Sequence, residues 1–198
     1  MDKNLLKACK SALFSHKIIC FPTETVMGLG VLFNDEEAYN LLNKVKQRRE
    51  DKPYTLMLGD KDEIDKYAYV DKRIKSVIDK FLPGSLTLLL KAKENVPGYV
   101  THNTGIIGVR VPSNKEALEL LQYVEIPLLV PSANKSGEKP ALNDKEAYEI
   151  FKDEVEVIVP GSSFSGTPST IIDFTKDKPL LIREGNLSFE EVVKIYER

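Results

Sequence analysis

The chain has 198 residues, of which 42% are apolar and 29% are charged, and its net charge is −2. These values are ordinary for a globular protein that buries one core, so we expect a single domain over residues 1–198. They exclude a chain whose overall charge would draw it to nucleic acid or to an anionic membrane, which leaves only local patches for such binding.

Residues that could form disulfides or hold metals are scarce. The two cysteines, Cys9 and Cys20, and the two histidines, His16 and His102, match no disulfide framework and no metal cage. No apolar run approaches the ~20 residues that cross a bilayer, and residues 1–14 lack the continuous apolar centre of a signal peptide. We therefore expect a cytoplasmic protein with no membrane partner and no metal of its own.

The chain begins with alternating helical and strand-like segments. Apolar residues recur at helical spacing over residues 3–16, and the run at 18–21 predicts a buried strand. The segment 23–30 resembles a turn, because it joins hydroxyls, a carboxylate and two glycines before a second apolar run at 31–33.

The next helix ends in a group of positive charges. Asn34 with Glu37 three residues later is typical of a capping box, and the apolar stripe continues to Val45. The end of this helix carries Lys44, Lys46, Arg48 and Arg49. Pro53 prevents the helix from continuing.

The remaining residues repeat this alternation. Strand-like runs lie at 54–58, 86–90, 107–111, 127–130, 155–159, 169–174 and 180–183. Helical patterns lie between them: two short helices before Pro83, one behind a Ser113–Glu116 capping box, one at about 143–152, and a last one capped by Ser188 with Glu191. Strands interleaved with helices predict an α/β fold, a single domain with a mixed twisted sheet and flanking helices.

Four polar clusters stand beside these strands, where ligand sites of α/β proteins form. They are the turn at 23–30, the cations Lys46, Arg48 and Lys52, the segment Ser132–Asn134, and the loop reaching Ser169 with Arg183 on the next strand. The first and third clusters also suit ordinary turns, and the second suits a solvated helix end, where positive charge contributes ~0.3–1 kcal/mol.

Arg110 and Arg183 are harder to explain as plain structure. Each lies in an apolar strand, where a buried charge needs a carboxylate or an anionic ligand. Taken together, the clusters offer cations, hydroxyls and one amide, but no nucleophilic triad, no paired carboxylates and no Gly-x-x-x-x-Gly-Lys phosphate loop. Such a set suits the binding of phosphates and a small polar substrate. Gly28 and Gly30 do not make a dinucleotide fingerprint, because the third position is Phe33.

The order of these residues resembles the YrdC-type family of L-threonylcarbamoyladenylate synthases. The landmarks are Pro22-Thr23-Glu24-Thr25 with Gly28-Leu29-Gly30, Lys46-x-Arg48, Pro83-Gly84-x-Leu86-Thr87, Val109-Arg110-Val111-Pro112, Ser132-x-Asn134-x-Ser136-Gly137, and Ser169-Thr170 with Arg183. They span nearly the whole chain, and the chain is similar in extent to the single-domain members.

The resemblance implies a function and a set of roles. It implies a concave basic groove in which ATP, bicarbonate and L-threonine give threonylcarbamoyl-AMP and pyrophosphate for tRNA modification, with Mg²⁺ accompanying ATP. The residues implied to hold ATP are Lys46, Arg48, Lys52, Ser132, Asn134 and Arg183, with Lys46 and Arg48 acting in catalysis. The residues implied to surround threonine are Thr23, Arg110 and Ser169. A downstream threonylcarbamoyl transferase complex is the implied partner.

This chain departs from the family pattern at four places. Met27 and Met57 stand where the family has Tyr and often His, which bears on amino-acid specificity. Ile106 replaces a hydroxyl of some members, and the segment 138–141 lacks a serine. Three alternatives stay open: a tRNA or double-stranded RNA-binding module of the same fold, which would bind in a salt-dependent way, a carbamoyl-transferring relative, and a paralogue without synthase activity.

Overall fold

The computed structural model describes residues 1–47 and 53–198. The helices are α1 (Lys3–Phe14), α2 (Glu36–Lys46), α3 (Ile64–Tyr67), α4 (Lys72–Phe81), α5 (Gly98–Thr101), α6 (Lys115–Val124), α7 (Asp144–Phe151) and α8 (Phe189–Tyr196), with the 3-10 turn η1 (Lys61–Glu63). The strands are β1 (Ile19–Phe21), β2 (Gly28–Leu32), β3 (Thr55–Met57), β4 (Leu86–Lys91), β5 (Ile106–Arg110), β6 (Leu128–Leu129), β7 (Val157–Ile158), β8 (Thr170–Asp173) and β9 (Leu180–Arg183).

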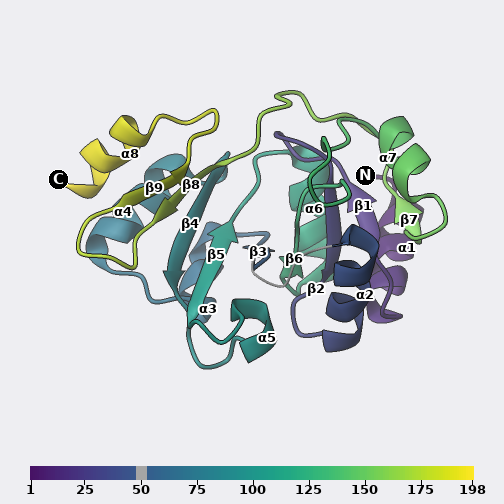
Figure 1. The fold of residues 1–198 in the computed structure, drawn as a ribbon, viewed down its shortest axis with the longest axis horizontal. Coiled ribbons are helices and arrows are strands. Elements are labelled where there is room, and N and C mark those ends of the chain that lie inside the picture. Colours follow the sequence, from purple (N-terminus) through teal and green to yellow (C-terminus); the bar gives the residue numbers. More distant parts are fainter. Residues whose placement is uncertain (48–52) are drawn as a thin grey trace.

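One mixed sheet runs through the molecule in the order β7-β1-β2-β6-β3-β5-β4-β8-β9. Three pairs are parallel (β1 with β7, β3 with β5, β4 with β8) and the other five are antiparallel. In Figure 1, α4 and α8 lie beside β8 and β9 at one end, and α1, α2 and α7 surround β1 and β2 at the other. The predicted α/β fold with a mixed sheet and flanking helices is therefore confirmed.

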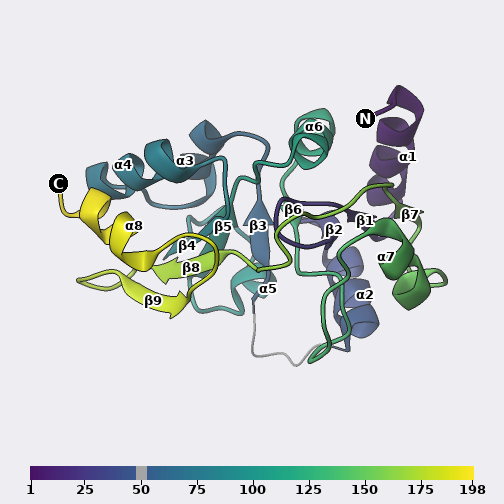
Figure 2. The same ribbon diagram turned by 90° about the horizontal axis from the view of Figure 1, so that it is seen from above.

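Two hydrophobic clusters hold the helices to the sheet. The smaller one packs α1 and α6 against Phe21 and Leu128, and Figure 2 shows these two helices on the same side of the sheet. The larger one joins apolar residues of α2, α4, α7 and α8 to the strands. Both cysteines are free and buried within these clusters, and burial raises the pKa of Cys9 to about 11 and that of Cys20 to about 12.

Two of the predicted capping boxes are shifted by one residue. Asp35, not Asn34, caps α2 and accepts a hydrogen bond from Ala38 N, and Asn114, not Ser113, caps α6. A carboxylate or amide oxygen is as good a cap as a hydroxyl, so neighbouring candidates cannot be separated by residue type alone. Ser188 does lie at the N-cap of α8, but its side chain makes no capping bond.

The turn between the first two strands is shorter than predicted. β2 begins at Gly28, so both glycines are strand residues. A Cβ on Gly28 would lie 2.6 Å from Val130 Cγ1, which explains why this strand needs a glycine where it passes the next chain segment. A short helix, α5, also lies between the strand-like runs at 86–90 and 107–111, where we recognised no helical pattern in the sequence.

The last strand is not buried as predicted. β9 is an edge strand, and Leu180 and Ile182 are about half exposed, at 51% and 52%. Within the described part of the chain, no helix is long and apolar enough to cross a membrane.

Candidate functional site

A cleft of about 610 Å³ crosses the middle of the sheet. Its walls carry polar and charged side chains from seven separate segments of the chain, and Figure 1 shows the central strands β3, β5, β4 and β8 that form its floor. Of the residues predicted to bind substrates, the cleft is lined by Arg110, Ser132, Asn134, Ser169 and Arg183. Arg48 and Lys52 lie outside the described residues.

The strand register explains how the sequence brings these side chains together. Successive pairings put Met57 beside Arg110, Thr87 beside Ile171, and Ile171 beside Arg183. Between β5 and β4, Val109 pairs with Leu88, so Arg110 and Thr87 are the next residues along this antiparallel pair. Paired residues on neighbouring strands project from the same face, at a spacing of about 4.8 Å. The two arginines therefore belong to one row across the cleft, three strand spacings or about 14 Å apart at the backbone.

Arg110 is buried and paired with a protein carboxylate. Its Nη2 donates to Glu24 Oε1 at 2.7 Å and to Thr25 Oγ1 at 3.0 Å, and its Nε donates to Gly84 O at 3.3 Å. The second oxygen of Glu24, Oε2, is buried without a hydrogen-bond partner among the described residues. The ion pair with Arg110 therefore offsets the cost of holding the negative charge of Glu24 in this position.

Arg183 differs from Arg110 because, among the described residues, its guanidinium is bonded to a serine and not to a carboxylate. Its Nε and Nη2 donate to Ser169 O at 3.0 and 2.8 Å, and Nη2 also reaches Ser169 Oγ at 3.3 Å. No carboxylate within the described residues forms an ion pair with it. Burial, and next the charge of Arg110, lower the pKa of Arg183 from its usual value. An anion bound in the cleft would stabilise the charged form of Arg183 and so oppose both causes of its lowered pKa.

Lys46 is not at the solvated helix end that the sequence suggested. Its side chain is buried, at 2% exposure, and its Nζ donates to Ser132 O at 2.6 Å, Asn134 O at 2.8 Å and Asn134 Oδ1 at 3.2 Å. The ammonium thus fixes the Ser132–Asn134 segment to the end of α2 and places a positive charge behind it. Lys46 itself does not line the cleft.

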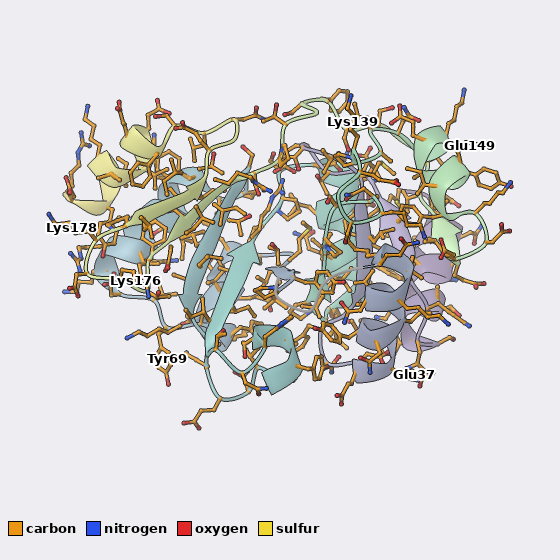
Figure 3. All side chains as sticks on the ribbon, viewed as in Figure 1. Glu37, Tyr69, Lys139, Glu149, Lys176 and Lys178 are labelled. Atoms are coloured by element: carbon orange, nitrogen blue, oxygen red, sulfur yellow. The ribbon has the colours of Figure 1, made fainter. Side chains whose placement is uncertain are left out.

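Asn134 organises its own loop. Its Oδ1 accepts from Ser132 Oγ at 2.6 Å as well as from Lys46, and its Nδ2 donates to Lys135 O and Glu138 O at 2.8 and 2.9 Å. The side chain therefore shapes the cleft wall rather than offering a free donor. In Figure 3, Lys139 lies just beyond this loop at the edge of the molecule, pointing away from the sheet.

Thr23 holds the turn, and its neighbour lines the cleft. Thr23 Oγ1 donates to Val26 O at 2.7 Å, accepts from Thr25 N at 3.2 Å and lies 2.9 Å from Thr25 Oγ1. Thr25, which we did not single out from the sequence, reaches the cleft and binds Arg110. The two threonines stand two apart in one turn, so local pattern did not tell which one would face the site.

The departures from the family pattern fall in different places. Met57 lies on the cleft floor at 2% exposure, whereas Met27 is fully buried in the larger cluster and does not line the cleft. Ile106 lies at the far end of β5, paired with Lys91, away from the cleft lining. Within the described residues, no group of three or more metal-ligating side chains is close enough to hold a metal.

The backbone of residues 168–169 passes close to Gly185, so we expect a side chain at this position to destabilise the protein. A Cβ there would lie 2.1 Å from Pro168 O and 2.7 Å from Ser169 C, so the backbone beside Arg183 must shift. We expect Gly185→Ala to lower the free energy of unfolding by ~1–3 kcal/mol, measured by denaturant titration. Gly98→Ala is the matched control, because its Cβ would meet only the flexible side chain of Asn103. Equal stability of the two variants would contradict the prediction.

Comparisons with known proteins point in one direction. The Sua5/YciO/YrdC family model, described as "Telomere recombination", matches residues 11–185. A Methanocaldococcus jannaschii protein provisionally named a threonylcarbamoyl-AMP synthase is 36% identical over 193 residues, covering 97% of this chain and 91% of that protein. The threonylcarbamoyl-AMP synthase of Pyrococcus abyssi is 34% identical, and the match covers 90% of this chain and 53% of that protein.

A solved structure is similar over nearly the whole fold. The crystal structure of P. abyssi Sua5 complexed with L-threonine superposes with a TM-score of 0.92 at 32% identity, covering 96% of this chain and 56% of that one. The chain is also 31% identical to the uncharacterized protein YciO of Escherichia coli, covering 85% of this chain and 82% of YciO.

Proposed function

The chain belongs to the Sua5/YciO/YrdC family, and on that basis we propose that it is an L-threonylcarbamoyladenylate synthase. It would convert L-threonine, bicarbonate and ATP into threonylcarbamoyl-AMP and pyrophosphate, for tRNA threonylcarbamoyl modification. The observation that carries the proposal is the convergence of Arg110, Arg183, Ser132 and Ser169 on one cleft of a fold shared with a threonine-bound relative.

The different partners of Arg110 and Arg183 suggest which part of the cleft each substrate would occupy. Arg183 has no carboxylate partner among the described residues, and it would bind the phosphates of ATP through charge-assisted bonds. Arg110 is already neutralised by Glu24, so it would bind the single charge of an amino-acid carboxylate through its Nη1, for which we find no protein partner in the described residues. Ser169 lies between these two regions.

The roles of the remaining predicted residues follow from their positions. Lys46 would support the nucleotide end of the cleft from behind the Ser132–Asn134 segment, as a positive charge and as an anchor for that loop. Arg48 and Lys52 remain predictions for the phosphates. Thr23 would act on threonine through the turn that positions Thr25 and Glu24. Together these cations would give the cleft its basic character.

The chemistry asks the protein for positioning and charge compensation. The amino group of threonine and bicarbonate give a carbamate and water, and a carbamate oxygen then attacks the α-phosphorus of ATP while pyrophosphate leaves. In such transfers most of the catalysis comes from alignment and from offsetting negative charge. Mg²⁺ would arrive with ATP, as part of the substrate. The cell's cytoplasm supplies ATP and tRNA, and a downstream threonylcarbamoyl transferase complex would consume the product.

The direct test is incubation with ATP, bicarbonate and individual amino acids while pyrophosphate is measured. We expect threonine to stimulate release most strongly, with serine about 10-fold weaker or more, because a lost methyl contact costs ~1–3 kcal/mol. Pyrophosphate release without amino-acid dependence would contradict the proposal. Salt-sensitive binding of tRNA or double-stranded RNA without any release would instead favour the RNA-binding module.

A further inference from the structure

One hydroxyl on the cleft floor has no hydrogen-bond partner among the residues that the structure describes. Six hydroxyl-bearing side chains line the cleft: Thr25, Tyr54, Thr55, Thr87, Ser132 and Ser169. Five of them have protein hydrogen-bond partners, namely Thr23 and Arg110 for Thr25, Asn43 for Tyr54, Ser169 and Thr87 for each other, and Asn134 for Ser132. For Thr55 Oγ1, no partner is found in the described part of the chain.

The neighbouring strand leaves this hydroxyl accessible. Thr55 pairs in register with Gly108, which has no side chain to cover it. A Cβ on Gly108 would lie 3.7 Å from Thr55 Oγ1, 3.4 Å from Thr87 Cγ2 and 3.2 Å from Leu89 Cδ2. The glycine therefore keeps a notch of about one methyl group open beside the threonine.

Thr55 lies one register row from Arg110. Both project from the cleft face, since Thr55 pairs with Gly108 and Met57 pairs with Arg110, two residues further along each strand. Two residues of strand span about 7 Å. Because both residues line the same cleft, we expect one bound small molecule to contact both groups.

The two groups match the functional groups of a β-hydroxy amino acid. The carboxylate of such a molecule suits Arg110, and its hydroxyl is carried two carbons away, on the side where Thr55 offers both a donor and an acceptor. Met57 and Leu89, which flank this row, supply apolar surface for the methyl group of threonine. This inference rests on the proposed function. We infer that Thr55 Oγ1 hydrogen-bonds the substrate hydroxyl and so determines the preference for threonine over amino acids of the same shape that lack the hydroxyl.

The test compares two ligands that differ only in that hydroxyl. L-Threonine and L-2-aminobutyrate are titrated into the full chain by calorimetry, in the presence of a non-hydrolysable ATP analogue. Thr55→Val removes the hydroxyl and keeps the branched shape that suits a strand. We expect it to weaken threonine binding about 10-fold or more and to leave 2-aminobutyrate within about twofold. Thr55→Ser should retain the preference for threonine.

Controls separate this inference from simpler explanations. Thr101→Val makes the same chemical change away from the cleft, where the hydroxyl bonds Gly98 O, and should alter neither affinity. Equal losses for both amino acids, or unchanged binding of threonine by Thr55→Val, would overturn the role of Thr55. If the unaltered chain binds neither amino acid, the proposed function itself fails.

Discussion

Replacing Lys46 by methionine should both destabilise the protein and abolish pyrophosphate release. The ammonium donates to three acceptors of the Ser132–Asn134 segment, and a methionine of similar length can satisfy none of them. A buried acceptor left without its donor costs ~1–3 kcal/mol, so we expect the free energy of unfolding to fall by ~2–4 kcal/mol. The loop that forms the cleft wall would then lose its anchor.

Lys44→Met is the matched control for this variant. Lys44 lies two residues earlier on the same helix and is exposed, and its charge favours the helix end through the macrodipole. Its loss should change stability by no more than ~0.5 kcal/mol and leave pyrophosphate release near that of the unaltered chain. If denaturant titration gives the same stability for both variants, the buried anchoring role of Lys46 is wrong.

Local sequence patterns predicted the strands and the longer helices of this fold. Each strand-like run predicted from the sequence coincides with a strand, because alternating or continuous apolar residues are bounded by Gly, Pro and Asn. The same patterns could not separate adjacent capping candidates, and they missed α5, which is a single turn of four residues. Short helices carry too few apolar repeats to be recognised by period.

The properties of the site depended on contacts between distant segments. Lys46 meets Ser132 and Glu24 meets Arg110 across 86 residues of chain in each case, so neither burial nor pairing could be read from local composition. The same holds for β9, whose apolar run predicts a buried strand although the sheet order leaves it at an edge. The candidate residues themselves were recognised from the order of the motifs, whereas Thr25 and Thr55 emerged only from the geometry.

The two arginines of the cleft should respond differently to the same substitution. Arg110→Met removes the charge that neutralises Glu24, whose Oε2 already lacks a partner in the described residues. A buried carboxylate left alone costs ~3–5 kcal/mol, so we expect a large drop in the free energy of unfolding together with loss of amino-acid binding. Adding Glu24→Gln to Arg110→Met should restore much of the stability, because the uncompensated charge is then gone, but not the binding.

Arg183→Met provides the comparison, since Arg183 bonds only Ser169 and has no carboxylate to leave behind among the described residues. We expect it to fold with nearly unchanged stability and to bind ATP tenfold more weakly or worse, which is about 1.4 kcal/mol. Thermal melts and ATP titrations of the two variants distinguish a structural ion pair from a ligand-binding cation. A large loss of stability in Arg183→Met with unchanged ATP affinity would reverse the assignment, and it would mean that the guanidinium holds β9 to the Ser169 loop rather than the nucleotide to the cleft.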